Sequence, residues 1–193
     1  WCPPAGQTGF SALGEVLAGK TNPSGKTSDT FLNDLTQSVT YNNFGKYEYT
    51  NMTDKAAKYK GFTGDDVTAI PGFVNYSEGI YVGYKFYETA SDEGLIDYDD
   101  TVAFPFGYGL SYTSFDQKLD SVKYKGGKVT VTATVTNTGS KAGKDVVEVY
   151  YNPPYTDGGI EKASRNLAGF EKTKELKPGE SQKVTVEFDD DDM

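Results

Sequence analysis

The chain has 193 residues, of which 28 are acidic and 19 are basic, so its formal net charge is −9. This charge would repel a polyanion, and no apolar run approaches the roughly 20 residues of a membrane-spanning helix, so we expect neither a nucleic-acid partner nor a membrane partner. The absence of histidine excludes a Ser-His-Asp or Cys-His site within the chain and removes the commonest zinc ligand.

Residues 7–19 have the apolar spacing of a short amphipathic helix. The apolar positions are Phe10, Leu13, Val16 and Leu17. Gly19 follows where a left-handed residue commonly ends a helix. The next residues, Thr21-Asn22-Pro23-Ser24-Gly25-Lys26, have the composition of a turn, because Pro fixes φ while Gly and Asn tolerate positive φ.

Residues 32–73 are polar and show no clear period, which predicts a long loop. Aromatic side chains are scattered through it at Tyr41, Phe44, Tyr47, Tyr49, Tyr59, Phe62 and Phe73. Loops of this length are uncommon inside a compact domain and are often functional. We therefore expect this loop to lie against protein that is absent from the chain.

Residues 76–89 are rich in aromatic and β-branched types, and their pattern leaves helix and strand equally open. A polar loop is predicted from Ser91 to Thr101. In the segment 104–112 that follows, Pro105 favours an extended predecessor, and the glycines allow close approach of the backbone.

Strict alternation from Lys128 to Thr136 predicts a half-buried strand, with Val129, Val131, Ala133 and Val135 on the inner face. Residues 181–188 alternate in the same way, with Val184, Val186 and Phe188 inward. Further strands are predicted at 119–124, 145–151 and 167–170. The sequence therefore predicts an α/β segment followed by an all-β sandwich of the immunoglobulin type.

Such a sandwich needs about seven strands, and the sequence offers four or five. A sandwich made of only these four or five strands would have open sheet edges and an uncovered inner face. We therefore expect polypeptide to be missing after Met193. Neither Trp1 nor Met193 has the features of a natural terminus. Cys2 is the single cysteine, which favours a reducing compartment such as the cytoplasm, although secreted bacterial proteins also lack disulfides and the compartment stays open.

Several blocks in order resemble the family 3 glycoside hydrolases, which are typified by β-glucosidases. The first runs from Gly9 to Lys26, the second from Glu78 to Tyr87, where Lys85 replaces a common Arg, and the third from Phe104 to Thr113. The segments Val135–Gly139, Ala142-Gly143 and Leu176–Ser181 resemble the fibronectin-III-like domain of that family. Together the blocks span almost the whole chain.

The resemblance implies a domain organisation. Residues 1–112 would be the last part of the family's α/β sandwich domain, and residues 113–193 an incomplete fibronectin-III-like domain. A TIM-type barrel and the rest of the α/β sandwich domain would be missing partners. The stretch from Pro153 to Lys162 resembles a bacterial branch in which the barrel follows the fibronectin-III-like domain.

The resemblance also implies a function for the parent protein: a retaining β-glucosidase that removes terminal non-reducing β-D-glucosyl residues from oligosaccharides or glycosides. A β-xylosidase or another exo-glycosidase of the family stays open. Retaining enzymes use two carboxylates roughly 5–5.5 Å apart. In the family the nucleophilic Asp lies on the barrel and the acid/base Glu lies upstream of this segment. We therefore expect no catalytic residue, metal or cofactor here, and the substrate-binding residues are not assigned.

Some side chains could still suggest a site of their own. The acidic pairs Asp65-Asp66 and Asp99-Asp100 and the run Asp189–Asp192 are interpreted as solvated loops, because no calcium-loop pattern is present. Glu78 is expected to pair with a buried donor. A second group, Tyr81, Tyr84, Phe86, Phe104, Phe106 and Tyr108, could stack on a sugar, but packing is the favoured interpretation.

Other sequence patterns give weaker indications of function. Gly107-Tyr108-Gly109 lacks the Gly-Lys-Ser/Thr ending of a phosphate loop. Asn51-Met52-Thr53 and Asn75-Tyr76-Ser77 are glycosylation sequons that matter only in a eukaryotic secretory setting. Three hypotheses remain: an inactive segment of an enzyme, a non-catalytic carbohydrate-binding module, and a structural spacer. Substrate contact, if the segment makes any, is expected at the leaving-group subsite through residues 40–75.

Overall fold

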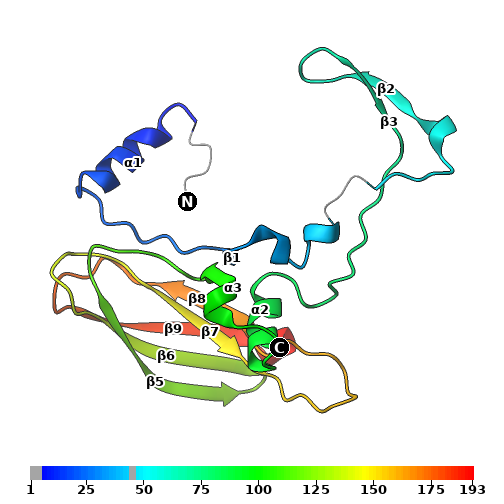
Figure 1. The fold of residues 1–193 in the computed structure, drawn as a ribbon. Helices are drawn as coiled ribbons and strands as arrows, with labels where there is room; N and C mark the ends of the chain where they lie inside the picture. The colour runs from blue at the N-terminus through cyan, green and yellow to red at the C-terminus, as the bar shows by residue number, and fades with distance from the viewer. Residues whose placement is uncertain (1–5, 44–46) are drawn as a thin grey trace.

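The computed structural model describes residues 6–43 and 47–193, so Phe44 of the predicted loop lies outside the described residues. A first part of short helices and strands precedes a β-sandwich (Figure 1). This order confirms the predicted fold class, an α/β segment followed by an all-β sandwich. No helix of the described ranges is both long and apolar enough to cross a bilayer.

The helices and strands are short in the first part and longer in the second. The first part contains α1 (Gly9–Leu17), β1 (Phe31–Leu32), the 3-10 helices η1 (Leu35–Gln37), η2 (Tyr41–Asn43) and η3 (Thr53–Lys55), β2 (Ala57–Lys60), β3 (Asp66–Ala69), α2 (Tyr84–Asp92), α3 (Tyr98–Thr101) and β4 (Val102–Phe104). The second part contains β5 (Phe115–Lys125), β6 (Lys128–Asn137), β7 (Val146–Tyr151), β8 (Asn166–Lys172), β9 (Ser181–Asp189) and the 3-10 helix η4 (Asp190–Asp192).

The sandwich has two antiparallel sheets, one in the order β5-β6-β9 and the other formed by β7 and β8. Buried apolar residues from both sheets and from the β8–β9 connection form its core: Val129, Val131, Ala133, Val135, Val147, Leu176, Val184, Val186 and Phe188. Every side chain that the alternating pattern predicted to point inward in β6 and β9 is among them. The pattern is reliable here because one face of each strand is buried and the other is not.

Two strands are longer in the structure than the sequence predicted. The strand predicted at 119–124 begins at Phe115, and the one predicted at 167–170 spans Asn166–Lys172. In β5 an irregularity between Leu119 and Ser121 interrupts the alternation, and most side chains of this strand are exposed. A strand that buries little and carries a bulge leaves no clear period of two in its sequence.

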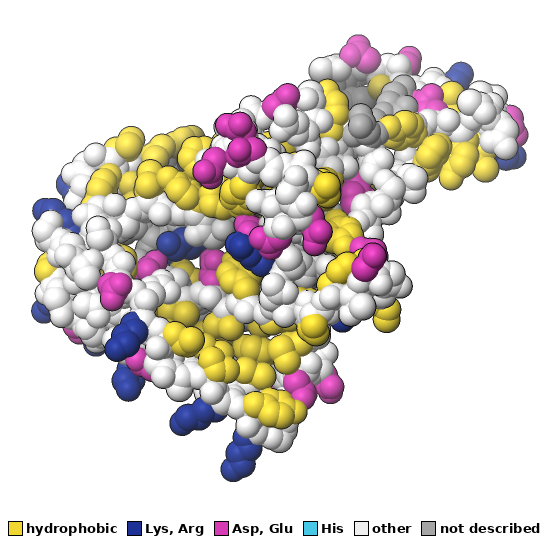
Figure 2. Space-filling view, turned by 60° about the horizontal axis from the view of Figure 1, so that its bottom comes forward, with side chains coloured by type: hydrophobic (Ala, Val, Ile, Leu, Met, Phe, Trp, Pro, Cys, Tyr) yellow, Lys and Arg dark blue, Asp and Glu magenta, His cyan; other side chains and the backbone are white. Residues whose placement is uncertain are grey.

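The inner face of β5 is uncovered from Leu119 onward. Leu119, Val122 and Tyr124 lie opposite core residues of β6, and antiparallel partners directly opposite each other share a face of the sheet. These three side chains are nevertheless 61%, 60% and 65% exposed. The β7–β8 sheet therefore covers β6, β9 and the first residues of β5 but not the rest of β5, as expected for a sandwich with too few strands. Exposed hydrophobic side chains also gather elsewhere on the face shown in Figure 2.

The predicted helix at 7–19 is present as α1, and Gly19 has the expected positive φ of 68°. None of the residues of α1 is buried, and Leu17 is 76% exposed. Figure 1 shows this helix standing apart from the sandwich. The apolar stripe that identified the helix therefore has no partner among the described residues.

The predicted turn at 21–26 is wrong. Residues 22–27 have no regular turn and run along the sandwich and the 105–112 segment. Turn composition misled the prediction because Asn22 uses its side chain in contacts with distant residues, and Thr27 uses its backbone in the same way. Asn and Pro also suit an extended segment held by long-range hydrogen bonds.

Regular structure interrupts the predicted loop at 32–73. The strands β2 and β3 pair from Ala57 opposite Ala69 to Lys60 opposite Asp66, and Gly64 takes a φ of 86° in the connection. No residue of either strand is buried, so neither face selects apolar side chains. A hairpin without a buried face lacks the alternation by which strands are recognised.

Between residues 76 and 101 the structure resolves an ambiguity and corrects a prediction. Gly83, with a φ of 59°, precedes α2, which settles this segment as helix from Tyr84 onward. The polar loop predicted from Ser91 to Thr101 is interrupted by the end of α2 and by α3. The carboxylate of Asp97 accepts a hydrogen bond from the backbone N–H of Asp100, which is an N-cap that the prediction overlooked.

Candidate functional site

The end of the first motif block and parts of the second and third blocks lie against the sandwich, and we call this region the joint. Thr27, directly after the first block, pairs with the third block through its backbone. Thr27 N–H donates to the Tyr108 carbonyl, and Gly107 N–H donates to the Thr27 carbonyl, both at 2.8 Å. The Thr27 hydroxyl also donates to the Pro105 carbonyl at 2.6 Å. Segments about 80 residues apart in sequence thus form one unit.

Asn22 connects this unit to the sandwich. Its side-chain amide donates to the Ala142 carbonyl at 2.8 Å. Its carbonyl oxygen accepts from the Ser111 hydroxyl at 3.0 Å and from the Tyr112 N–H at 2.8 Å. One amide therefore bonds to two separate loops. Gly143 lies so close to it that an added Cβ would come within 2.6 Å of the Asn22 side-chain nitrogen.

Lysine side chains make the next links in the joint. The Lys26 ammonium lies 3.1 Å from a carboxylate oxygen of Asp145, whose side chain is only 12% exposed. The other Asp145 oxygen accepts from the Gln117 amide at 2.8 Å. The Lys172 ammonium donates to the Ser24 carbonyl at 2.9 Å. A mostly buried carboxylate with both oxygens satisfied is a stable arrangement, since an unpaired charge there would be costly.

Helix α2 packs on the strands through aromatic rings. The Tyr84 ring centroid lies 4.7 Å from that of Phe106 and 6.0 Å from that of Tyr150 on β7. The Tyr84 hydroxyl accepts the backbone N–H of Leu167 at 2.8 Å. Five residues further along α2, the Thr89 hydroxyl oxygen accepts the Ser164 N–H at 3.0 Å. The helix is thus bound to the start of β8 by rings and by polar contacts.

Arg165 is the only arginine in the sequence, and it pairs with α2. Its guanidinium lies 2.5 Å from a Glu88 oxygen and 3.5 Å from an Asp92 oxygen. The Tyr98 hydroxyl donates to the other Glu88 oxygen at 2.6 Å, and burial together with this hydrogen bond raises the pKa of Tyr98. An arginine can hold two carboxylates one helical turn apart because its donors form a planar fork.

Two more tyrosines bond to carboxylates around the joint. The Tyr150 hydroxyl donates to Glu148 at 2.7 Å, and burial followed by this hydrogen bond raises its pKa. The Tyr81 hydroxyl donates to Glu161 at 2.5 Å, which raises the pKa of Tyr81 to about 12. The loop before β8 is therefore tied to the residues that precede α2.

Five of the aromatic residues that could stack on a sugar contact other aromatic rings: Tyr84, Phe86, Phe104, Phe106 and Tyr108. Phe86 lies edge-on to Tyr87 at 5.2 Å, and Phe104 lies 5.1 Å from Tyr108 and 6.4 Å from Phe31. These contacts agree with the packing interpretation. Gly107 sits against the Glu148 carboxylate with a φ of 77°, so the Gly-Tyr-Gly run makes room for the strand that it packs on.

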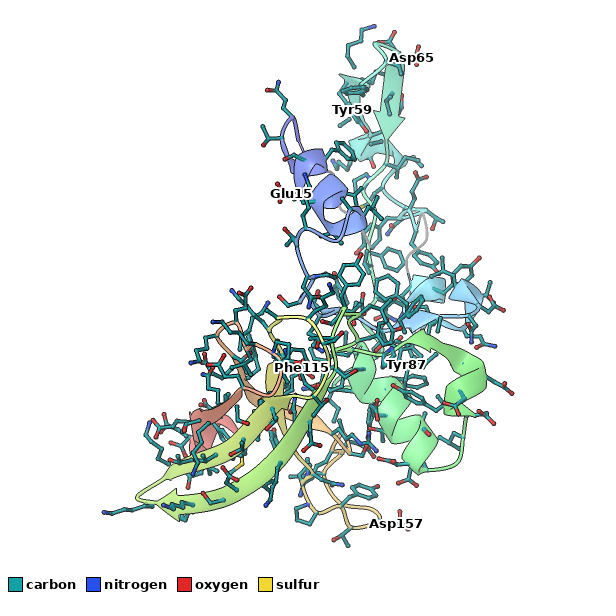
Figure 3. The ribbon with its side chains drawn as sticks, turned by 90° about the vertical axis from the view of Figure 1, so that its left-hand side faces the viewer. Glu15, Tyr59, Asp65, Tyr87, Phe115 and Asp157 are labelled. Carbon is teal, nitrogen blue, oxygen red and sulfur yellow. The ribbon has the colours of Figure 1, made fainter. Side chains whose placement is uncertain are left out.

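The acidic pairs lie apart from the joint or on its surface. Asp65 and Asp66 are exposed on the far hairpin, at the opposite end of the molecule from Asp157 (Figure 3). Asp99 and Asp100 are exposed on α3. In the 189–192 run, Asp190 accepts from the Tyr124 hydroxyl at 2.6 Å. Across the described ranges, no three acidic, histidine or cysteine side chains are placed to hold a metal ion.

Glu78 is hydrogen-bonded, and the asparagines of the two sequons are exposed. One Glu78 oxygen accepts the Asn43 side-chain amide at 2.7 Å, so this acid is paired as expected, although its donor is half-buried rather than buried. Asn51 and Asn75, the sequon asparagines, are exposed. Sequence reasoning missed the roles of Asn22, Asp145 and Arg165. Only Arg165 carried a signal, since a single arginine among many lysines suggests a position where the planar fork is needed.

Known proteins match this fold and this chain closely. Residues 145–193 match the fibronectin type III-like domain family. The β-glucosidase of Ruminococcus albus is 39% identical over 97% of this chain. The crystal structure of a β-glucosidase from Paenibacillus barengoltzii covers 96% of this chain at 36% identity with a TM-score of 0.74. An exo-α-(1→6)-L-arabinopyranosidase of Bifidobacterium breve is 33% identical over 96% of the chain.

The second part of the chain is thus a fibronectin type III-like sandwich joined to an α/β segment. The chain as a whole has the sequence and fold of a segment of the family 3 glycoside hydrolases of the β-glucosidase type. It spans only 16% of the R. albus relative, 17% of the P. barengoltzii structure and 20% of the B. breve relative. These shares agree with the expectation that the chain is part of a larger enzyme.

Proposed function

We propose that this chain is the supporting segment of a retaining β-glucosidase and that the catalytic carboxylates lie in polypeptide outside it. The observation that carries the proposal is the joint itself. Asn22, Tyr84 and Gly107, from the three family blocks of the first part, all serve to attach the α/β segment to the sandwich. Residues used in this way position other parts of an enzyme rather than act on its substrate.

The proposal includes a division of the chain near residues 112 and 113. Residues 1–112 would complete an α/β sandwich domain and residues 113–193 would brace it, while a barrel supplies the nucleophile. The exposed inner face of β5 supports the view that Leu119, Val122 and Tyr124 are covered by further polypeptide in the parent. Similarity to the R. albus enzyme and the 153–162 stretch support a bacterial source.

The substrate proposed for the parent is a terminal β-D-glucosyl residue of an oligosaccharide or glycoside. The name of the R. albus relative supports this choice, whereas the name of the B. breve relative keeps other exo-glycosidic specificities in view. The function of this segment does not depend on which sugar is removed, because the joint contacts involve only residues of the segment itself.

A segment exchange tests the proposal. The P. barengoltzii β-glucosidase is produced with this chain in place of its matching segment, and hydrolysis of an aryl β-glucoside is measured. We expect turnover, and we expect a lower melting temperature when the exchanged segment carries Asn22→Ala together with Arg165→Met. A soluble, folded chimera without turnover contradicts the supporting role.

A further inference from the structure

A hollow lies between the end of α1 and the sandwich. Its volume is about 950 Å³, which is within the range of small-molecule sites. One wall consists of residues 18–22, Ser24 and Tyr112, and the other consists of residues 140–144 and Glu175. The hollow therefore lies where the first part of the chain meets the connection between β6 and β7.

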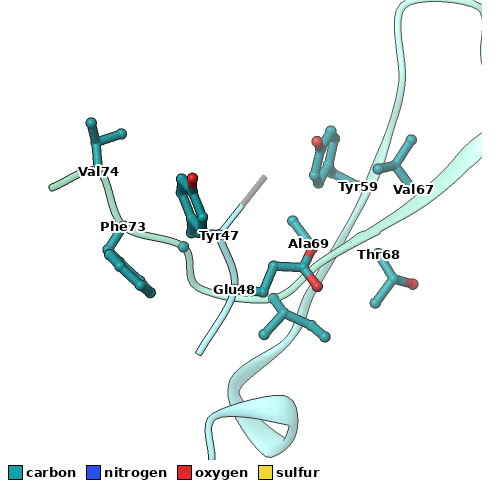
Figure 4. Close-up of a pocket in the computed structure, with 10 residues that line it drawn as sticks. Tyr47, Glu48, Tyr59, Val67, Thr68, Ala69, Phe73 and Val74 are labelled. Atoms are coloured by element: carbon teal, nitrogen blue, oxygen red, sulfur yellow. The ribbon is translucent and has the colours of Figure 1, made fainter. Parts of the chain in front are cut away.

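A smaller hollow, of about 460 Å³ at the base of the β2–β3 hairpin, provides a contrast in charge. Figure 4 shows Tyr47 and Tyr59 on opposite sides of it, with the Glu48 side chain between them. Among the described residues, Glu48 is its single charged lining residue. The hollow beside α1 differs because its lining is rich in lysine.

Lysines stand on both walls of the larger hollow. Lys20 belongs to the first wall, and Lys141 and Lys144 belong to the second. All three are exposed, and none forms an ion pair within residues 6–43 and 47–193. Glu175 is the acidic residue of the lining, so three ammonium groups face one carboxylate. The resulting excess of two positive charges favours an anion.

Hydrogen bonds hold the two walls in place. Asn22 joins them through the contacts described above. Gly143 N–H donates to the Leu176 carbonyl at 3.1 Å, and Leu176 N–H donates back to the Gly143 carbonyl at 2.8 Å. The Tyr112 hydroxyl donates to the Val16 carbonyl of α1 at 2.8 Å. The backbone around the lysines is therefore positioned before any ligand arrives.

Two effects oppose an anion, and both are weak at this position. The carboxyl end of a helix is partly negative, but the Val16 carbonyl also accepts the Gly19 N–H at 2.9 Å, and the Glu15 carbonyl accepts the Lys20 N–H at 2.9 Å. The chain carries a net charge of −9, but physiological salt screens charges beyond about 8 Å. A long polyanion would meet the acidic surface, whereas a small anion in the hollow meets the lysines.

The chemistry of the lining selects the kind of anion. A lysine ammonium is a compact charge without the planar fork of arginine, so it recognises charge rather than a flat carboxylate. Ser24 and Ser140 line the hollow as well and add hydroxyl donors. Small oxyanions with two or more negative charges match this lining, and polycarboxylates and polyphosphates share that chemistry.

We propose that the hollow binds a small multivalent oxyanion that bridges Lys20 beside α1 to Lys141 and Lys144 on the sandwich. The bound anion would fasten α1, which buries no residue of its own, to the second part of the chain. Binding should be weak, with a Kd of about 1 mM, because the three lysines are exposed to solvent.

Titration of the 193-residue chain with citrate and with pyrophosphate at low salt, followed by amide chemical shifts, tests this site. We expect shifts confined to residues 18–24 and 140–144 and to Glu175. Lys20→Gln and Lys141→Gln, on opposite walls, should each weaken binding about three- to fivefold. Glu175→Gln should strengthen it about twofold. The anion that binds more tightly shows whether a polycarboxylate or a polyphosphate is the preferred ligand.

Lys123→Gln is the matched control. Lys123 is exposed on β5 and has no ion pair with a described residue, but it does not line the hollow, so its removal should leave the affinity unchanged. Acetate, with one charge, should bind at least about tenfold more weakly. Absence of binding by both anions, equal loss in Lys123→Gln and Lys141→Gln, no loss in Lys20→Gln, or equal affinity for acetate would each overturn the proposal.

This inference does not depend on the proposed function. The titration measures binding and needs no turnover, so a silent titration beside an active chimera removes the anion site and leaves the supporting role intact. Specific binding beside an inactive chimera keeps the anion site and removes the supporting role.

Discussion

The sandwich and the segment before residue 76 bury their apolar side chains to very different extents. In β6, and in β9 from Val184 onward, every second residue is buried, and Val135 and Val184 are 0% and 2% exposed. In α1 and the β2–β3 hairpin no residue is buried, and Leu17 and Phe62 are largely or wholly exposed.

The two regions therefore derive their stability from different sources. The sandwich is stabilised by side chains within the chain, since the burial of apolar area is the main favourable term in folding. The earlier segment is held by its hydrogen bonds and by the joint, and its apolar surface is available to other molecules. Changes in the sandwich core should therefore cost far more than equal changes in α1.

The largest effect is expected for Leu176→Ala. Leu176 is fully buried in the core, and its truncation leaves a cavity, so the free energy of unfolding should fall by about 3 kcal/mol. Urea denaturation monitored by circular dichroism measures this. Leu17→Ala on α1 is the control and should change the value by less than about 0.5 kcal/mol. Equal losses in the two variants would refute the contrast.

Gly107→Ala tests whether the joint is held by close packing. A side chain there would be strained by the positive φ and would also meet the Glu148 carboxylate, so we expect a loss of about 2 kcal/mol. Gly158→Ala is matched to it, with a φ of 75° and no atom within 4 Å, and should cost about 1 kcal/mol. Identical costs would show that Gly107 has no packing role.

What the sequence could predict follows the same division. Alternation identified the inward residues of β6 and β9 correctly because burial on one face selects them. The β2–β3 hairpin was missed because nothing selects its faces, and the turn at 21–26 was wrong because Asn22 bonds to residues about 90 and 120 positions away. Local patterns cannot reveal contacts between such distant positions. Of the joint, the family blocks were recognised, but their mutual contacts were not.

Arg165→Met tests the polar side of the joint. The variant removes the pairing with Glu88 and Asp92 but keeps an unbranched apolar chain. The guanidinium is half exposed, so solvent weakens the pairing, and we expect a loss of only about 1 kcal/mol in chemical denaturation. Lys183→Met removes a 3.9 Å pair with Asp120 at an exposed position and should have almost no effect. A larger cost for Lys183 would contradict this ranking.

The smallest effect is expected in alkali. The phenols of Tyr81, Tyr98 and Tyr150 all have raised pKa values, so the folded joint prefers their protonated forms. Their contribution to the free energy of unfolding is complete below the ordinary pKa of 10.0 and declines as the pH rises above it, through about 12 for Tyr81.

Tyrosinate absorbance as a function of pH, together with denaturation midpoints on either side of the ordinary tyrosine pKa, measures this decline. In Tyr81→Phe the Glu161 hydrogen bond is absent, so this variant should lose less stability in alkali than the original chain. An unchanged pH profile in the variant would show that the Tyr81 contact does not stabilise the joint.

Hydrolysis of an aryl β-glucoside by the purified 193-residue chain tests most directly the claim that these residues support chemistry performed elsewhere. We expect a rate equal to that of buffer at every pH, while the intact P. barengoltzii enzyme, assayed in parallel, turns the substrate over. Turnover that co-purifies with the chain and follows its concentration would instead place a catalytic site within it.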